Sequence, residues 1–295
     1  MENLFIGVDG GGTKTEAIIQ NESGQRIGRG VAGPGNIKTS AHGSFQSVQT
    51  AVQQALISAD IQDPHNYSLH IGLGMAGTEV PSAKSSFLQI PHPFRTIVLN
   101  SDAYIACLGV HGGQNGAIII IGTGVIGMQI ENDEVSRAGG YGFPHSDEGG
   151  GAWIGLELMR ATFKAYDGYV SWTPALEKVF AHFNHDIQAM TTFANASAAK
   201  PGSFGELSHI LIQALDEHDP FATELLMEAA NYVNQIWDAL SRKTKTKLPC
   251  CLLGGIAPFV QPYLTARLKS CIVPRKMNAP EGAILMLKKH MGLIT

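Results

Sequence analysis

The sequence predicts an α/β fold made of two mixed-sheet domains with a cleft between them. At 295 residues the chain has room for two domains of ordinary size. A glycine-rich turn between two strand-like segments occurs twice, first after Phe5 and again after Gly116. After each turn, segments with helical spacing alternate with short apolar segments, which is typical of α/β domains. The repeated opening indicates a duplicated domain, whose halves begin near Leu4 and Gly116.

The first turn follows an apolar strand that ends in Asp9, and it is the run Gly10-Gly11-Gly12-Thr13-Lys14-Thr15. Glycines leave backbone N–H groups uncovered, while the threonine hydroxyls and the lysine charge add further donors for phosphate oxygens. Asp9 is placed to hold Mg2+ through bound water. The sequence therefore predicts a phosphate cradle, and a glycine-rich hairpin without a ligand is the alternative.

This turn is not a Walker A loop. Gly7 and Gly12 bracket four residues as that motif requires, but its lysine would fall at position 13, where the chain has Thr13. A Walker loop also opens a helix, whereas residues 16–20 continue with strand character to a turn at residues 21–24. We therefore expect the glycines to lie in a β-hairpin.

The other elements of the first half are predicted from spacing. Residues 44–58 carry apolar residues at helical intervals, and residues 69–74 and 96–100 are compact apolar segments of strand type. The latter strand leads into a helix expected over residues 103–110.

The second half begins with the strand, turn and strand of residues 116–130. Residues 152–166 and 222–240 are predicted helices, and residues 250–253 form a last strand that ends at two glycines. Between the two helices we expect a polar region interrupted by prolines, namely Pro174, Pro201 and Pro220.

Composition favours small-molecule partners. The formal net charge is −4, from 25 acidic and 21 basic side chains, and there is no electrostatic footprint for nucleic acid or a membrane. No run approaches the roughly 20 apolar residues of a membrane span, and the N-terminus lacks signal-peptide features, so we expect a cytoplasmic protein. The 4 cysteines include no C-x-x-C pair, which favours reduced thiols without zinc.

Five segments, taken in order, resemble the sugar kinase, Hsp70 and actin superfamily, whose members bind ATP between two ribonuclease-H-like domains. They are the first phosphate loop at 9–15, a linking segment at 99–102, the second phosphate loop at 122–124, the adenosine segment at 253–257 and the final helix at 280–283. The resemblance implies an actin-like ATPase fold with an interdomain cleft for ATP and sugar. Because the final helix of the family returns to the first domain, we expect domains at 1–112 plus 280–295 and at 113–279.

Within that superfamily the chain is most similar to the BadF/BadG group, specifically its N-acetylglucosamine kinases and bacterial glucosamine kinases. The most specific element is residues 139–153, which resemble the glycine-rich Gly-Asp-Glu-Gly segment of the family. Residues 99–103 and 181–186 are similar to bacterial glucosamine kinase. The resemblance implies phosphorylation of an amino sugar at its 6-hydroxyl with ATP and Mg2+, glucosamine being preferred to N-acetylglucosamine, by a homodimer.

The same resemblance assigns site residues. It places Asp102 beside the 6-hydroxyl as the catalytic base, with a helix N-cap as the structural alternative. Ser146 stands where many N-acetylglucosamine kinases have glycine, which leaves the choice between free and acetylated sugar open. The implied ATP-binding residues are Gly11, Gly12, Thr13, Lys14, Thr15, Gly122, Thr123, Gly124, Gly254 and Gly255, and the implied sugar-binding residues are Asn36, Gly77, Thr78, Asp102, Ser146, Asp147 and Glu148.

Two other functions differ in kind from the kinase. An activator ATPase of 2-hydroxyacyl-CoA dehydratases shares the ATP fold but holds an iron–sulfur cluster on cysteines, and no cysteine occurs between Cys107 and Cys250. A non-enzymatic sugar sensor would need a DNA-binding module, which we do not expect before the first strand, and it would have no use for Asp102. The sequence therefore favours the kinase.

Overall fold

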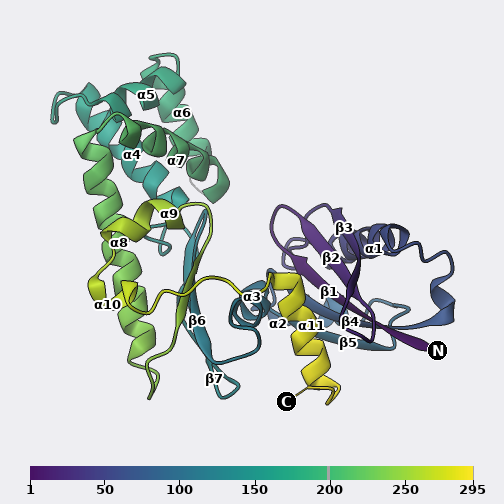
Figure 1. Cartoon of the computed structure of the whole chain (residues 1–295). Helices are drawn as coiled ribbons and strands as arrows, with labels where there is room; N and C mark the ends of the chain where they lie inside the picture. Colours follow the sequence, from purple (N-terminus) through teal and green to yellow (C-terminus); the bar gives the residue numbers. More distant parts are fainter. Residues whose placement is uncertain (198–199, 295) are drawn as a thin grey trace. The chain divides into compact units, whose positions relative to one another are not determined.

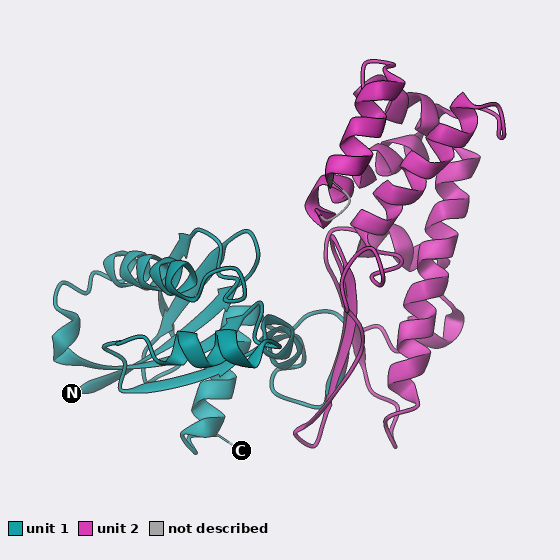
Figure 2. Cartoon of the chain, turned by 180° about the vertical axis from the view of Figure 1, so that it is seen from behind, with its two compact units in different colours: residues 1–116, 274–295 teal, residues 117–273 magenta. Residues whose placement is uncertain are grey.

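The computed structural model describes residues 1–197 and 200–294, and the chain forms two compact units (Figure 1, Figure 2). Unit 1 comprises Met1–Gly116 and Pro274–Thr295, and unit 2 comprises Ala117–Val273. The limits expected from the sequence, at residues 112 and 280, lie a few residues from these divisions.

Unit 1 is built on a five-stranded sheet in the order β3-β2-β1-β4-β5. β1 pairs antiparallel with β2 and parallel with β4, and β4 pairs parallel with β5. The elements are β1 (Glu2–Gly10), β2 (Thr15–Gln20), β3 (Arg26–Ala32), α1 (Ala41–Ser58), η1 (Pro64–Asn66), β4 (Tyr67–Met75), α2 (Pro81–Leu88), β5 (Thr96–Asn100), α3 (Asp102–His111) and α11 (Ala279–His290). The predicted hairpin is confirmed, as are the helices and strands expected in this half.

Alternation along β1 sends side chains to both faces of this sheet. Leu4, Ile6 and Val8 are buried in a core that also takes in residues of α1 and α2. Phe5 faces the other way and packs with Ile284 of α11. Because burying one such side chain contributes roughly 1.5–3 kcal/mol, both helical layers stabilise the sheet.

The C-terminal helix α11 lies close against β1 and β4. Gly7 and Gly72 are register partners in these strands, and a Cβ on either would collide with the backbone of α11. The helix begins with a capping box, in which the Asn278 side chain accepts from the Glu281 amide and the Glu281 carboxylate accepts from the Asn278 amide. The close approach explains why a segment so late in the sequence belongs to unit 1.

Unit 2 has a four-stranded sheet in the order β8-β7-β6-β9, with β7 and β8 antiparallel and β6 and β9 parallel. Its elements are β6 (Gly116–Ile121), β7 (Val125–Glu131), β8 (Glu134–Gly139), α4 (Gly151–Tyr166), α5 (Pro174–His182), α6 (Ile187–Ser197), α7 (Pro201–Asp216), α8 (Pro220–Ser241), β9 (Cys250–Leu253), α9 (Ala257–Val260), η2 (Gln261–Tyr263) and α10 (Ala266–Lys269). One core joins the sheet to α4, α7 and α8, through buried residues such as Ile119, Trp153, Leu211 and Val233. The predicted second hairpin, both long helices and the last strand are confirmed.

The expectation of a polar region between α4 and α8 is corrected by the structure. The described residues there form the helices α5, α6 and α7. Pro174, Pro201 and Pro220 each stand in the first turn of a helix, α5, α7 and α8 respectively. Proline is favoured there, since its fixed φ suits the helix and its missing N–H would have had no helical partner. These prolines therefore mark helix starts, and not the interruptions that the sequence suggested.

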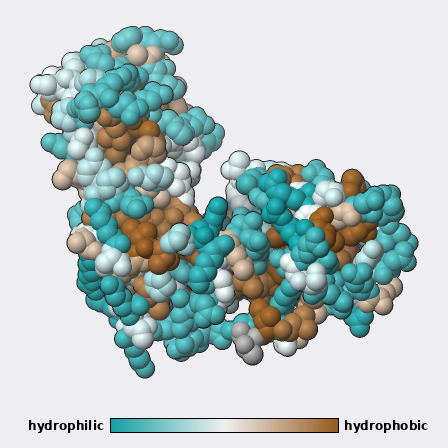
Figure 3. Space-filling view, in the orientation of Figure 1, coloured by the Kyte–Doolittle hydropathy of each residue, from teal (hydrophilic) through white to brown (hydrophobic). Residues whose placement is uncertain are grey.

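Hydrophilic residues cover most of the face shown in Figure 3, with hydrophobic areas between them on both units. Large apolar side chains that reach the surface include Tyr169 and Trp172, in the segment between α4 and α5. Among the described residues, no helix has the length and apolar character needed to cross a membrane.

Candidate active site

The first glycine turn joins β1 to β2 at the surface of unit 1. Gly12, Thr13 and Lys14 are exposed, and the Gly11 amide donates to the Lys14 carbonyl at 2.9 Å. A Cβ at Gly12 would meet no atom within 4 Å, so a ligand can approach its backbone closely. Thr15 differs, because its side chain is fully buried and its hydroxyl has no hydrogen-bond partner among the described residues.

Lys14 belongs to a small charge cluster. Its Nζ lies 3.2 Å from one oxygen of the Glu16 carboxylate, and the Arg29 Nε lies 2.9 Å from the other. Burial alone would raise the pKa of Glu16, but hydrogen bonds from Arg29 and Lys14 hold this pKa below its ordinary value. A phosphate that recruited Lys14 would therefore leave Glu16 paired with Arg29.

Two further loops of unit 1 are hydrogen-bonded to this turn. The Gly35 amide donates to the Gly11 carbonyl at 2.8 Å, and the Ala76 amide donates to the Gly10 carbonyl at 2.8 Å. The Ile37 amide in turn donates to the Ala76 carbonyl at 3.0 Å. The segments around residues 35 and 76 are therefore held beside the glycine turn.

Asn36 and Gly77 meet where these two loops come together. The Asn36 Oδ1 accepts from the Lys38 amide at 3.0 Å, which gives this side chain a turn-forming role. Gly77 has a φ of 88°, and a Cβ there would collide with the Asn36 side chain. Thr78, the next residue, is half-buried. The structure thus gathers three of the expected sugar-binding residues beside the first turn.

Asp102 is the first residue of α3, and one residue, Ser101, separates it from β5. The N-cap is its neighbour Ser101, whose hydroxyl accepts from the Tyr104 amide at 3.1 Å. The capping role proposed as the alternative for Asp102 therefore belongs to Ser101. The Asp102 carboxylate accepts from the adjacent Ala103 amide at 2.8 Å. Burial raises the pKa of Asp102, and the Glu79 charge adds to this effect.

The charge of Asp102 acts on Asp9 within unit 1. Asp9 lies one residue before the end of β1, where burial together with the negative charges of Asp102 and Glu16 raises its pKa to about 6, against a smaller opposing effect of Lys14. Two carboxylates with raised pKa values beside an open glycine turn are what a proton-transfer or cation site requires. Both residues were named from the sequence, but the effects of the Glu16 and Glu79 charges on their pKa values were not foreseen.

The second glycine turn joins β6 to β7 in unit 2, and hydrogen bonds to neighbouring backbone hold its carbonyl groups. The Gly122 amide donates to the Gly124 carbonyl at 2.9 Å, while the Gly122 and Thr123 carbonyls accept from the first two amides of α4, at 2.8 Å each. Gly254, with φ 94°, packs against the Ile121 carbonyl at the end of β6. A Cβ at Gly122 or Gly255 would meet nothing within 4 Å, so the backbone is open at both positions.

Asp147 packs against this second turn. A Cβ on Gly124 would collide with the Asp147 carboxylate, whose Oδ1 is buried and has no hydrogen-bond partner among the described residues. Asp147 has a φ of 73°, a left-handed conformation that aspartate adopts more readily than most residues. Burial raises the pKa of this carboxyl, and hydrogen bonds from the Gly142 and Val125 amides oppose the rise.

A pocket of about 190 Å³ brings Ser146, Asp147 and Glu148 together with one face of α8. Tyr232 on that face has its pKa raised, first by burial and then by the charges of nearby glutamates, including Glu148. The sequence analysis missed this face of α8. Its spacing could have revealed it, because the lining residues Tyr232, Gln235, Ile236 and Ala239 recur at helical intervals.

The described residues contain no group of three or more histidine, cysteine, aspartate and glutamate side chains placed to hold a metal ion. Mg2+ does not require one, since it is commonly held by one or two carboxylates together with water and phosphate oxygens. The adjacent carboxylates of Asp9 and Asp102 fit that donor set. All four cysteines are buried.

Two α/β units, each with a glycine turn between its first two strands, are the plan of an ATP-dependent phosphotransferase of the actin-like class, and comparison with known proteins gives the family. The chain belongs to the BadF/BadG/BcrA/BcrD ATPase family, whose model matches residues 6–290. The glucosamine kinase GspK of Vibrio cholerae is 37% identical over 97% of this chain and 96% of its own length. An N-acetyl-D-glucosamine kinase of Dictyostelium discoideum is 27% identical, over 86% of this chain and 85% of its own.

Solved structures agree on the fold. A protein of Chromobacterium violaceum, described as a candidate N-acetylglucosamine kinase, superposes with a TM-score of 0.88 and 30% identity, over 97% of this chain and 99% of that one. A ROK family glucokinase from Streptomyces griseus, in complex with glucose and AMPPNP, has a TM-score of 0.55 at 13% identity, with 97% and 100% covered. The expected actin-like ATPase fold with two α/β domains is confirmed.

Proposed function

We propose that this protein is a kinase that transfers the γ-phosphoryl group of ATP to the 6-hydroxyl of an amino sugar, with glucosamine preferred. The observation that carries the proposal is the pair of carboxylates with raised pKa values, Asp9 and Asp102, beside an open glycine turn. The 37% identity to a glucosamine kinase over nearly the whole chain supports the choice of sugar.

Asp102 is proposed as the general base. As the new bond forms between the sugar oxygen and phosphorus, and the bond from phosphorus to the ADP oxygen breaks, Asp102 takes the proton of the hydroxyl. Burial supports this role, because a raised pKa makes the carboxylate a stronger proton acceptor. Ser101 supports it too, since the helix cap does not depend on Asp102.

Asp9 is proposed to hold Mg2+ through water, with Asp102 close enough to add to the negative potential. When bound, the ion neutralises charge on the transferred phosphoryl group. Gly11, Gly12, Thr13 and Lys14 are proposed to bind phosphate oxygens. The exposure of Gly12, Thr13 and Lys14 supports this assignment, whereas the hydroxyl of Thr15 is buried in the protein.

In unit 2, Gly122 and Thr123 are proposed to donate to phosphate, and Gly254 and Gly255 to line the adenosine site. The open backbone at Gly122 and Gly255 supports both roles. Ser146, Asp147 and Glu148 are proposed to bind the sugar. The unpartnered carboxylate oxygen of Asp147 suits a donor such as an ammonium group.

The test is product identification with kinetics. The purified protein is incubated with Mg-ATP and glucosamine, N-acetylglucosamine, glucose or mannosamine, and kcat/KM is measured for each. We expect glucosamine 6-phosphate as the best product. A tenfold preference for N-acetylglucosamine, about 1.4 kcal/mol, would overturn the choice of sugar but leave the kinase.

N-Acetylglucosamine is the second candidate, because relatives described as kinases of that sugar match most of the chain. We further propose, from the sequence resemblance, that the protein works as a cytoplasmic homodimer. Size-exclusion chromatography with light scattering measures the mass directly. A monomer at working concentration would contradict the dimer without affecting the proposed reaction.

A further inference from the structure

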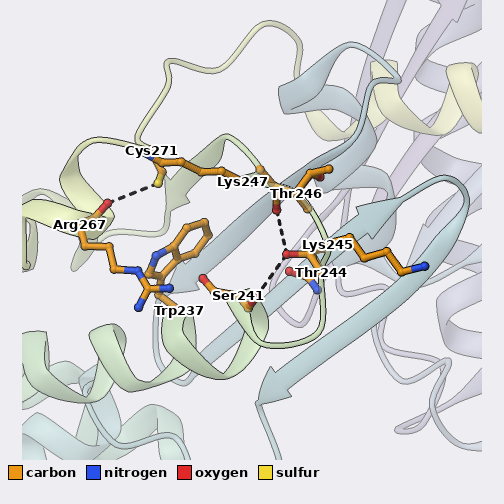
Figure 4. A pocket seen from close by; sticks show the side chains of 10 residues that line it. Trp237, Ser241, Thr244, Lys245, Thr246, Lys247, Arg267 and Cys271 are labelled. Carbon is orange, nitrogen blue, oxygen red and sulfur yellow. Dashed lines mark hydrogen bonds between the residues drawn. The ribbon is translucent and has the colours of Figure 1, made fainter.

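A second pocket in unit 2, of about 400 Å³, lies between the C-terminal end of α8, the loop that leads into β9, and α10 (Figure 4). β6 and β9 run parallel with Ala117 opposite Cys250, and the loop enters β9 at its first residue. The glycine turn after β6 is at the other end of these strands. The pocket is therefore separate from the second glycine turn. Its lining residues are Gln129, Trp237, Ser241, Thr244, Lys245, Thr246, Lys247, Leu248, Arg267 and Cys271.

The lining of this pocket is cationic. It includes Lys245, Lys247 and Arg267 but no carboxylate. Figure 4 shows Lys245 directed away from the other labelled side chains, so Lys247 and Arg267 are the cations that serve the pocket. The Lys247 ammonium donates to the Ser270 hydroxyl at 3.0 Å and keeps two further N–H groups.

The carboxylates next to the pocket already have partners. Asp238 accepts from Arg267 at 3.2 Å, a contact that uses one of five guanidinium N–H groups. Glu131 accepts from the Thr246 hydroxyl and, at 3.4 Å, from the Lys245 amide. Cationic donors of Arg267 and Lys247 therefore remain for an anionic ligand.

Trp237 supplies an independent observation. This residue is only 4% exposed, and its indole N–H has no hydrogen-bond partner among the described residues. Buried donors are nearly always paired, because an unpaired one has lost its water without compensation. Trp237 lines the pocket but its indole nitrogen is covered, so an acceptor atom of a ligand there pairs with this donor once the ring or a neighbouring side chain shifts slightly.

We propose that this pocket binds a hexose phosphate at a site distinct from the catalytic one. Lys247 and Arg267 receive the phosphate, and the Trp237 indole N–H with the Ser241 hydroxyl binds oxygen atoms of the sugar. An aromatic side chain beside hydroxyl groups suits a sugar ring, whereas a bare anion would use only the cations.

The pocket is connected through α8 and β7 to the smaller pocket that Asp147 and Glu148 line. Helix α8 carries Trp237 and Ser241 into this pocket and Tyr232 into the pocket of Asp147 and Glu148. Strand β7 likewise contributes Gln129 to one pocket and Val125 to the other. A ligand that shifts α8 therefore has a direct physical route to the proposed sugar-binding residues.

The experiment is calorimetric titration of the whole protein with glucose 6-phosphate, inorganic phosphate and citrate, followed in parallel by tryptophan fluorescence. We expect glucose 6-phosphate to bind most tightly and to change the fluorescence. Trp237→Phe, which keeps the ring but removes the donor, and Lys247→Gln should each weaken binding by about tenfold. Lys247 is exposed, so its variant tests the site even if Trp237→Phe is poorly folded.

One control variant locates the binding. Lys243→Gln removes the same charge from the same loop, where Lys243 contacts the Arg137 carbonyl and does not line the pocket, so binding should be unchanged. No binding up to about 10 mM, wild-type affinity in both pocket variants, or equal weakening by Lys243→Gln would overturn the site. Inorganic phosphate or citrate binding as tightly as glucose 6-phosphate would overturn the sugar part.

Discussion

The two glycine turns have similar sequences but different surroundings, which are charged side chains at the first turn and close backbone contacts at the second. The first turn is surrounded by charge, since Asp102 and Glu16 raise the pKa of Asp9 and Lys14 opposes them. The second is surrounded by backbone, since the amides of α4 hold its carbonyls and Gly124 leaves room for Asp147. Substitutions near the first turn should therefore alter proton transfer and cation binding, and substitutions at the second turn should alter the shape of its backbone and of the Asp147 contact.

The largest effect is expected from Asp102→Asn. The amide keeps the size of the carboxylate but cannot take the proton, so kcat should fall roughly 100 to 10,000-fold. Calorimetry should show ATP and sugar affinities within a few-fold of wild type. A loss of less than about tenfold in kcat would contradict the proposal that Asp102 is the general base.

Asp9→Asn should lower activity and raise stability. The pKa of Asp9 rises from 3.8 to about 6 on folding, so the native state holds a proton that the unfolded state has released between these values. Stability is therefore lost as pH rises through this window, and wild type carries the full penalty at pH 7. Removing the charge should increase the free energy of unfolding by about 1–3 kcal/mol at pH 7, the lower values allowing for solvent screening.

Urea unfolding at pH 7 and near pH 3 checks this sign, because the gain should vanish where Asp9 is protonated in both states. Glu16→Gln is the matched control in the same cluster. Folding lowers the pKa of the Glu16 carboxylate, so its loss should slightly destabilise the protein at pH 7. A destabilised Asp9→Asn protein at pH 7 would contradict the electrostatic description of the first turn.

Gly124→Ala should show that the second turn depends on shape. The new methyl group would meet the Asp147 carboxylate, which should cost roughly 1–3 kcal/mol of stability and weaken substrate binding. Gly122→Ala is the comparison, since nothing within 4 Å opposes it. It should leave stability unchanged and raise the KM for ATP. Equal stability of the two variants would refute the steric account.

Ser101→Ala should have the smallest effect. Loss of an N-cap hydroxyl typically costs about 1 kcal/mol, and α3 would lose that amount without losing Asp102. Thermal unfolding should show the loss while kcat stays within a few-fold of wild type. A collapse of kcat equal to that of Asp102→Asn would show that the two residues act as one unit in catalysis.

Local sequence was a reliable guide where the chemistry is local. The glycine turns, the Asp102 position at a helix start and most strands followed from residue type and spacing, because backbone freedom and alternation act over a few residues. The helices at Pro174 and Pro201 were missed, since proline both ends and begins helices and only the following turn distinguishes the two.

The sequence by itself determined the order of the elements, the family resemblance and the candidate residues of both turns. Only the tertiary structure decided that Ser101 caps α3, that Thr15 is buried, and that Asp147 packs on Gly124. It also decided the raised pKa of Asp9, whose causes are burial and a carboxylate far along the chain. Desolvation and Coulomb energies depend on distances between segments remote in sequence, and those distances exist only once the chain has folded.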